Sequence, residues 1–257
     1  MVIIKKRFPF PVLPLLVLLM LCALVPPPAA EGSDDPSEWT FSATSYVWAS
    51  GLVGTVGVKG HKARIDMSFS DILDNMDLAG MAAFQGHKGK QFFFFNGLYL
   101  DQSDTEPLSS GRSVTVNVTM TRLEAGWGLR VLERESSSLY LFAGARYWDL
   151  KNGLTFRSGS GSIREFHENE SWLDPIVGFS WAVQLSPRLS FTTMADVGGF
   201  GVGSDFSWGA LVDLSWALSD RTSVQLGYRY LSVDYEKNGF VMDAYNDGFF
   251  IGFTWRL

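Results

Sequence analysis

The sequence predicts an all-β chain that folds as an antiparallel transmembrane β-barrel of about ten strands. Three observations predict it: a strictly alternating C-terminal segment, further segments with the same alternation, and short turns that alternate with longer connections. In the C-terminal segment, one row holds Phe249, Ile251, Phe253, Trp255 and Leu257, and the other row is small or polar and carries an arginine. Successive side chains of a strand point to opposite faces. One apolar and one polar face are what a wall between lipid and a polar lumen requires.

The first thirty residues are interpreted as a secretory signal peptide. They begin with the basic residues Lys5, Lys6 and Arg7, continue through an apolar stretch at 12–25, and end in small residues that predict cleavage after Ala30. The apolar stretch is shorter than the ~20 residues of a spanning helix, which disfavours a retained membrane anchor. Cleavage here predicts export to the bacterial outer membrane.

Residues 31–38 are predicted to form a polar N-terminal tail, and residues 39–257 a single transmembrane barrel domain. Loss of the signal peptide removes three basic residues and no acidic one, which changes the formal charge from −6 to −9, and it removes the only cysteine. The acidic balance argues against nucleic acid as a partner. After residue 30 no stretch of 18 consecutive apolar residues occurs, so no helical span is expected.

The strand segments are separated by turn residues, and none reads as a long amphipathic helix. They lie near residues 39–50, 78–87, 91–102, 112–132, 137–157, 165–185, 188–201, 205–218, 221–236 and 239–257. In outer-membrane barrels short turns face the periplasm and longer loops face outside. That parity predicts ten strands if 51–77 is one long outer excursion, and it makes 103–111 and 151–171 outer loops. Twelve strands result if a hairpin within 56–69 joins the wall, and eight if two segments are loops.

The excursion 51–77 carries further patterns. Residues 63–69 alternate like a short strand, and Ser70 can cap a helical turn. The apolar residues Ile72, Leu73 and Met76 of that turn are expected to cover the barrel mouth or to fold inside it.

The polar rows of the predicted strands carry charges that would form a network in the lumen. They are Arg122, Glu124, Arg130, Arg146, Asp174, Asp196, Asp213, Arg229 and Arg256. Strand order would place Glu124 near Arg146, and Asp213 near Arg229 and Arg256. Buried charges persist when they are paired, and small barrels are filled by side chains, so a packed lumen is favoured. A narrow polar pore is the alternative, because ten strands lie between filled eight-stranded barrels and open porins.

Aromatic residues at predicted strand ends are interpreted as the girdles that mark the two membrane interfaces. They are Trp39, Tyr147, Trp172, Trp181, Trp208, Trp216, Tyr228, Tyr230 and Trp255. A soluble, lipocalin-like barrel with an aromatic core is the alternative. It would need polar outer faces, whereas here wholly apolar rows alternate with small and charged ones.

Three segments carry a likeness to known proteins: residues 68–77 (SFSDILDNMD), 227–230 (GYRY) and 252–257 (GFTWRL). With the strand pattern, they resemble uncharacterised Gram-negative outer-membrane β-barrel proteins of the small, porin-like or opacity-like kind. The resemblance implies outer-membrane lipid and the barrel-assembly machinery as partners, and no catalytic set or cofactor. Phe253, Trp255 and Leu257 correspond to the C-terminal assembly signal, although such chains usually end in Phe.

Few residues offer catalytic or metal-binding chemistry. The histidines are His61, His87 and His167, and the spacing around His167 matches no outer-membrane hydrolase pattern considered. The acidic groups at 165–170 and 71–77 lack the alternation and central glycine of a calcium loop. No enzyme, metal or cofactor is therefore predicted.

The predicted function is that of a structural or surface-interaction protein at the cell surface, with a mostly packed polar lumen. A narrow, low-conductance pore for small solutes is the alternative, and a rim-sited hydrolase is a third hypothesis. The sequence does not identify the small solute or surface ligand.

Overall fold

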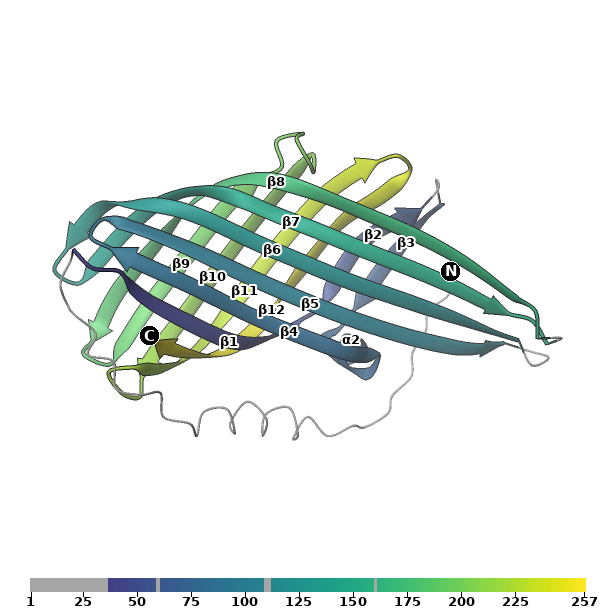
Figure 1. Cartoon of the computed structure of the whole chain (residues 1–257), viewed down its shortest axis with the longest axis horizontal. Helices are drawn as coiled ribbons and strands as arrows, with labels where there is room; N and C mark the ends of the chain where they lie inside the picture. The colour runs from purple at the N-terminus through teal and green to yellow at the C-terminus, as the bar shows by residue number, and fades with distance from the viewer. Residues whose placement is uncertain (1–36, 59–60, 109–111, 160) are drawn as a thin grey trace. The chain divides into compact units, whose positions relative to one another are not determined.

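A computed structural model describes residues 37–58, 61–108, 112–159 and 161–257 (Figure 1). The predicted signal peptide and most of the predicted tail lie outside the described residues. Where the chain is described, no helix has the length and apolar character needed to cross a membrane.

The described elements are almost all strands. They are β1 (Thr40–Ser50), β2 (Leu52–Val58), β3 (His61–Met67), α2 (Phe69–Asp74), β4 (Met76–Lys88), β5 (Gln91–Leu108), β6 (Arg112–Arg134), β7 (Ser137–Arg157), β8 (Ile163–Ser186), β9 (Leu189–Gly198), β10 (Phe206–Ala217), β11 (Thr222–Lys237) and β12 (Phe240–Arg256).

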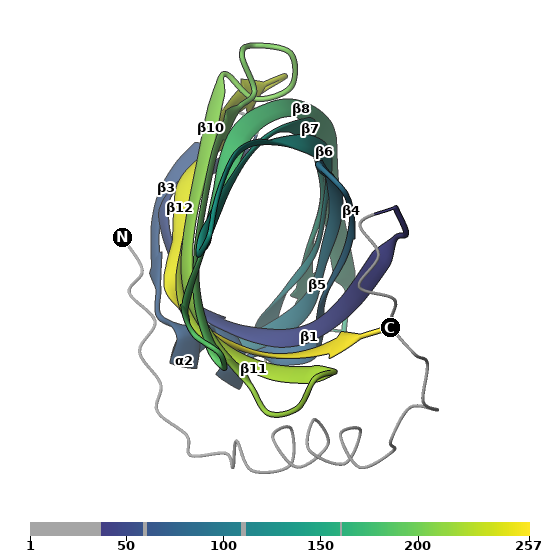
Figure 2. The same ribbon diagram turned by 90° about the vertical axis from the view of Figure 1, so that its left-hand side faces the viewer.

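The sheet closes on itself as an antiparallel barrel. From β4 to β12 each strand pairs with the next, and β1 pairs with both β4 and β12, so ten strands form the ring (Figure 2). The predicted ten-stranded antiparallel barrel is therefore confirmed. Closure leaves the ring without unpaired edges, which is what a sheet in a bilayer requires.

The two ends of the barrel differ. The start of β1, the end of β12 and the short turns after β4, β6, β8 and β10 lie together at one end, here called the turn end (Figure 1). The opposite end is called the distal end.

Residues 51–77 form wall rather than only the predicted loop excursion. β2 continues β1 along β12 in an unchanged register, from the pair Ser50–Gly248 to the pair Val53–Tyr245. Gly51 separates the two strands, and a Cβ there would lie 2.7 Å from the carbonyl oxygen of Met67. β3 adds to β2 at the distal end. The hairpin thus extends the wall to a sheet of twelve strands, of which ten close the ring.

The short helix α2 begins two residues earlier than predicted. Ser68, not Ser70, is the cap: its hydroxyl accepts from the Asp71 amide (3.3 Å), and the Asp71 carboxylate accepts from the Ser68 amide (2.9 Å). This reciprocal pair is a capping box. No residue of α2 is buried, and Gln102 of β5 donates to the Ile72 carbonyl oxygen (3.2 Å). The helix therefore lies against the distal wall and is not folded into the lumen.

Four strands project far beyond the others at the distal end. The ladders between β5 and β6 and between β7 and β8 run on to the pairs Leu108–Arg112 and Arg157–Ile163, whereas β9 pairs with β8 only from Ile176 onward (Figure 1). The prediction of long polar loops at 103–111 and 151–171 was wrong for most of these residues. Ladder hydrogen bonds join backbone groups, so a strand continues through polar residues when its neighbours continue too.

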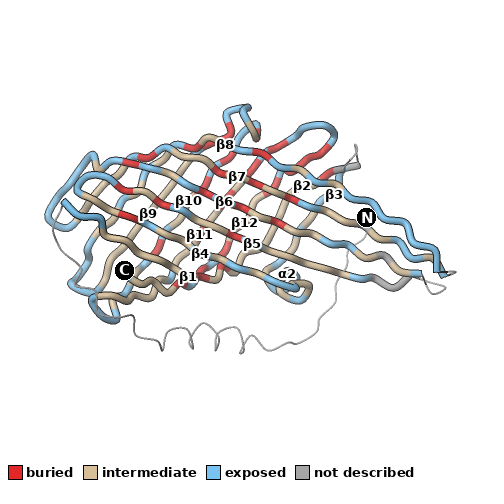
Figure 3. Tube along the Cα trace, viewed as in Figure 1, coloured by how far each residue is buried: buried red, intermediate tan, exposed pale blue. Residues whose placement is uncertain are grey.

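The two faces of the wall follow the sequence alternation. Leu129, Leu214 and Leu226 are exposed on the outer face, whereas Arg122 and Arg146 on the inner face are buried. Buried positions gather in the middle part of the barrel (Figure 3). Buried charged side chains therefore lie on the lumen side of the wall.

Candidate functional site

Five charged side chains from four strands meet in the middle of the lumen. They are Arg122 and Glu124 of β6, Arg146 of β7, Asp196 of β9 and Arg229 of β11, and are here called the ionic cluster. The Arg146 guanidinium donates to Glu124 (2.9 Å) and to Asp196 (2.7 Å). Arg229 donates to both carboxylate oxygens of Glu124 (2.9 and 2.8 Å). Because β6 and β11 are not neighbours in the ring, this last ion pair crosses the lumen.

Glu124 is the centre of the ionic cluster. Arg122 also approaches it, with Nε at 3.3 Å from Oε1, so three guanidinium groups surround one carboxylate. The guanidinium of Arg122 also lies over the Trp48 and Trp148 rings, at 5.3 and 5.6 Å from their centroids. Ion pairing and ring contacts together offset the cost of removing these charges from water.

Stacked aromatic rings fill the lumen on the distal side of the ionic cluster. Trp148 stacks on Trp172 (5.6 Å between centroids), Trp172 stacks on Tyr235 (4.0 Å), and Tyr235 contacts Phe240 (6.0 Å). These four residues and Trp48, all buried, are called the aromatic plug. The interpretation of Trp172 as a membrane girdle is therefore wrong. It shares the inward row of β8 with the buried Asp174, two residues away.

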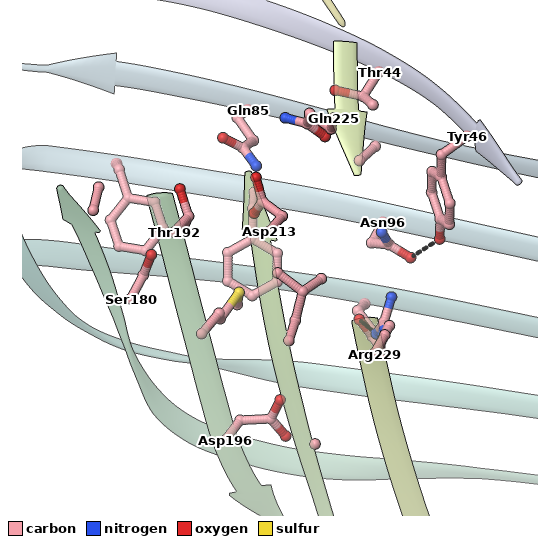
Figure 4. Close-up of a pocket in the computed structure, with 18 of the residues that line it drawn as sticks. Thr44, Tyr46, Gln85, Asn96, Ser180, Thr192, Asp196, Asp213, Gln225 and Arg229 are labelled. Atoms are coloured by element: carbon pink, nitrogen blue, oxygen red, sulfur yellow. Dashed lines mark hydrogen bonds and ion pairs between the residues drawn. The ribbon is translucent and has the colours of Figure 1, made fainter. Parts of the chain in front are cut away.

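A cavity of about 320 Å³ lies beside the ionic cluster, and is here called the luminal cavity. Gln85, Thr192, Asp213 and Gln225 surround the same space from four strands (Figure 4). Aromatic side chains complete the lining, among them Phe92, Phe94 and Tyr140.

A second cavity of about 380 Å³, the rim cavity, opens at the turn end. Its lining includes Ser42, Ser190, Ser215 and Arg256, and His87 lines both cavities. The lumen therefore has a packed distal part and a hollow part toward the turn end.

The other charges of the predicted network make no ion pair with the ionic cluster in the described structure. Arg130 pairs with Glu133 (2.9 Å), and Arg256 lines the rim cavity. Asp174 is buried and accepts from the Ser204 amide (2.7 Å).

Asp213 is not paired with Arg229 or Arg256 as the strand order predicted. Arg229 lies opposite Leu211, two residues before Asp213 in β10, and binds Glu124 instead. Arg256 lies opposite Ser42 at the turn end. A difference of two positions along a strand is therefore enough for an arginine to bind a different carboxylate across the lumen.

The aromatic plug and the luminal cavity were not anticipated from the sequence. A signal for the plug exists, because Trp148 and Trp172 occupy the same alternating rows as Arg146 and Asp174. The cavity has no comparable signal, since it results from small residues on several strands meeting across the lumen.

The described histidine side chains lie in different parts of the barrel. His167 lies 3.7 Å from Glu165, and both side chains are exposed. His87 stacks on Phe92 (5.8 Å), and the side chain of His61 lies outside the described part of the chain. Within the described ranges, no three His, Cys, Asp or Glu side chains come together as metal ligands would.

The C-terminal residues close the barrel. β12 pairs with β1 up to the pair Ser42–Arg256, and the Leu257 amide donates to the Phe41 carbonyl oxygen (2.9 Å). Phe253 and Trp255 contact each other edge to face, with centroids 4.4 Å apart.

Comparison with known proteins supports the fold. No protein-family model and no curated protein matches this chain. Among solved structures, the chain is similar to the outer membrane protease OmpT from Escherichia coli, at 10% identity, with 89% of this chain and 100% of that chain covered and a TM-score of 0.55.

Lower TM-scores are found for two other outer-membrane barrels. The translocator domain of the autotransporter NalP from Neisseria meningitidis gives 0.46, at 14% identity over 94% of this chain and 95% of that chain. The attachment invasion locus protein Ail of Yersinia pestis gives 0.37, at 12% identity over 85% of this chain and 98% of that chain. The likeness to OmpT shows the fold of an outer-membrane β-barrel.

Proposed function

We propose that this chain is a bacterial outer-membrane barrel with a closed lumen and a structural or surface-interaction role. The exposed apolar rows on the outer face and the fold shared with OmpT support the membrane location. In such barrels the short turns face the periplasm, so the turn end is assigned to the periplasm and the distal end to the outside.

The ion pair across the lumen carries the proposal of a closed barrel. Glu124 and Arg229 join β6 to β11, and Arg122 and Arg146 fill the space around them. The aromatic plug lies in series with this cluster. A solute would have to break buried ion pairs and displace stacked rings, and both steps are costly in a medium of low dielectric constant.

The projecting strands β5–β8 support the surface role. They carry exposed apolar side chains, including Phe156, Ile163 and Phe166, among polar neighbours. Exposed apolar patches that are rimmed by polar residues are typical of interaction sites. We propose that this sheet contacts a partner outside the cell.

Export and assembly follow from the two ends of the sequence. We propose that the signal peptide directs secretion and that the barrel-assembly machinery reads Phe253, Trp255 and Leu257. Outer-membrane lipid is then the partner of the apolar outer face. We propose no enzymatic activity, and replacement of His167 is expected to leave any activity of the protein unchanged.

Conductance in planar bilayers tests the closed lumen. The mature protein, refolded in detergent and shown to migrate faster on a gel unheated than boiled, is expected to give no discrete current steps. Steps in the unaltered protein would overturn the closed lumen.

A narrow pore is the second candidate, because the luminal cavity and the rim cavity hollow the lumen between the ionic cluster and the turn end. Current steps that disappear when the charge of Arg146 or Arg229 is changed would favour that pore.

A further inference from the structure

We infer that the luminal cavity binds a small organic ammonium ion, with Asp213 as its counter-charge. Asp213 projects from β10 into the cavity, where Figure 4 places it between Gln85 and Gln225. Its side chain is 8% exposed, and no hydrogen bond reaches Oδ1 from the described residues. An isolated carboxylate in such a place is costly, because it has lost water without gaining a donor.

The neighbouring arginines form no ion pair with Asp213. Arg146 and Arg229 direct their hydrogen bonds at Glu124 and Asp196, and Arg122 lies within 3.3 Å of Glu124. Asp213 thus lacks an ion pair in the described structure, as does Asp174, which does not line the cavity. The site therefore combines an unpaired carboxylate with the open volume of the luminal cavity.

The cavity lining suits an alkylammonium group. An ammonium carries three N–H donors and no acceptor, and Gln85, Gln225 and Thr192 add side-chain oxygens around Asp213. Phe92 and Phe94 add aromatic rings to the lining, and cations are attracted to such rings.

The size and polarity of the cavity limit the ligand. Met194 and Leu211 give apolar surface for a short carbon chain. The volume, about 320 Å³, lies at the lower end of the range for small-molecule pockets. An anion would face the Asp213 carboxylate. A divalent metal would find one carboxylate without an ion pair, because Glu124 and Asp196, which also line the cavity, are bonded to Arg229 and Arg146.

The ligand would reach the site from the turn end. The rim cavity is lined by hydroxyl-bearing residues, including Ser42, Ser190 and Ser215, and His87 lines both this cavity and the luminal cavity. The ionic cluster and the aromatic plug block the other direction. The site is therefore a dead-end pocket, reached from the side that we assign to the periplasm.

The methyl group of Met194 provides a local readout, because this residue lines the cavity. Mature protein carrying ¹³C-labelled methionine methyl groups is refolded in detergent and titrated at pH 7 with butylammonium chloride. A Met194→Leu variant identifies the signal. We expect a saturable shift of the Met194 methyl with butylammonium, and none at equal concentrations of 1-butanol or sodium chloride.

Variants separate the charge from the apolar lining. Asp213→Asn is expected to raise the dissociation constant at least tenfold, whereas Asp213→Glu keeps it within severalfold. Asp243→Asn, the same change at an exposed residue of β12 near the distal end, should leave it unchanged. Each variant is first checked for heat-modifiable migration.

Three results would overturn the inference. They are no saturable shift in the unaltered protein, an equal shift in folded Asp213→Asn, and an equal shift with 1-butanol or sodium chloride. None of these results would contradict the closed lumen, which conductance tests separately, or the surface role proposed for the projecting strands.

Discussion

Glu124 and Asp213 are both buried carboxylates in the same lumen, and their surroundings are opposite. Glu124 has three arginines within 3.3 Å, whereas Oδ1 of Asp213 receives no hydrogen bond from the described residues. The first charge is satisfied by permanent partners that tie strands together across the barrel. The second borders a cavity of about 320 Å³. The difference teaches that burial alone does not decide the role of a charged side chain. Permanent ion-pair partners make a buried charge structural, whereas a cavity beside it leaves room for a ligand as an exchangeable partner.

The largest effect is expected from Glu124→Gln. This change leaves three arginines without their shared carboxylate, and breaking a buried ion pair costs about 3–5 kcal/mol. The free energy of unfolding in detergent, measured by denaturant titration, should fall by that order.

Glu133→Gln is the matched control, because Glu133 is exposed and pairs with Arg130 near the turn end. It should shift the free energy of unfolding by less than about 1 kcal/mol. Equal losses in the two variants would remove the structural role assigned to the ionic cluster.

The next effect concerns Leu214, the neighbour of Asp213 on β10. Leu214 points outward, and arginine at the middle of the lipid face costs about 2–4 kcal/mol. We expect Leu214→Arg to reduce the fraction of protein that inserts into lipid vesicles. Leu218→Arg, at the end of the same outer row, should insert nearly normally. Normal insertion of Leu214→Arg would mean that the faces of β10 are reversed.

Asp213→Asn should behave in the opposite way to Glu124→Gln. Removing a charge that has no partner also removes its desolvation cost, which is about 1–3 kcal/mol for a buried unsatisfied group. Without added amine at pH 7, the free energy of unfolding is expected to stay level or to rise by about 1 kcal/mol. A loss as large as that of Glu124→Gln would show that Asp213 has a structural partner after all.

The alternation of side chains explains why the sequence predicts so much of this fold. A residue such as Leu214 faces lipid because Asp213 faces the lumen, and that relation holds wherever the strand is regular. The ring of ten strands follows from such rows together with the turns between them. The length of β5–β8 does not follow, because polar residues past the membrane are compatible with a loop or with a strand. Only the pairing of neighbouring strands decides between the two.

The ion-pair partners of a side chain across the lumen are harder to predict than the face of the wall on which the side chain lies. Adjacent strands place Glu124 opposite Arg146 by register, and the structure has that ion pair at 2.9 Å. The pair of Glu124 with Arg229 joins strands that are far apart in the ring, so barrel shape decides it. The same holds for the aromatic plug and for the space beside Asp213. Sequence periodicity thus indicates which residues enter the lumen, and closure of the barrel determines which of them meet.

The smallest effect is expected at an exposed ion pair with the same chemistry as the ionic cluster. Lys62 of β3 contacts Glu236 of β11 at 3.0 Å, and both side chains are at least half exposed. Water already solvates such charges, so Glu236→Gln should change the free energy of unfolding by about 0–1 kcal/mol, less at high salt. A double-mutant cycle with Lys62→Met isolates the pair. A coupling energy as large as that between Glu124 and Arg229 would mean that the Lys62–Glu236 pair is also shielded from water. Burial would then no longer distinguish the structural charges of the lumen from the exposed charges at the distal end.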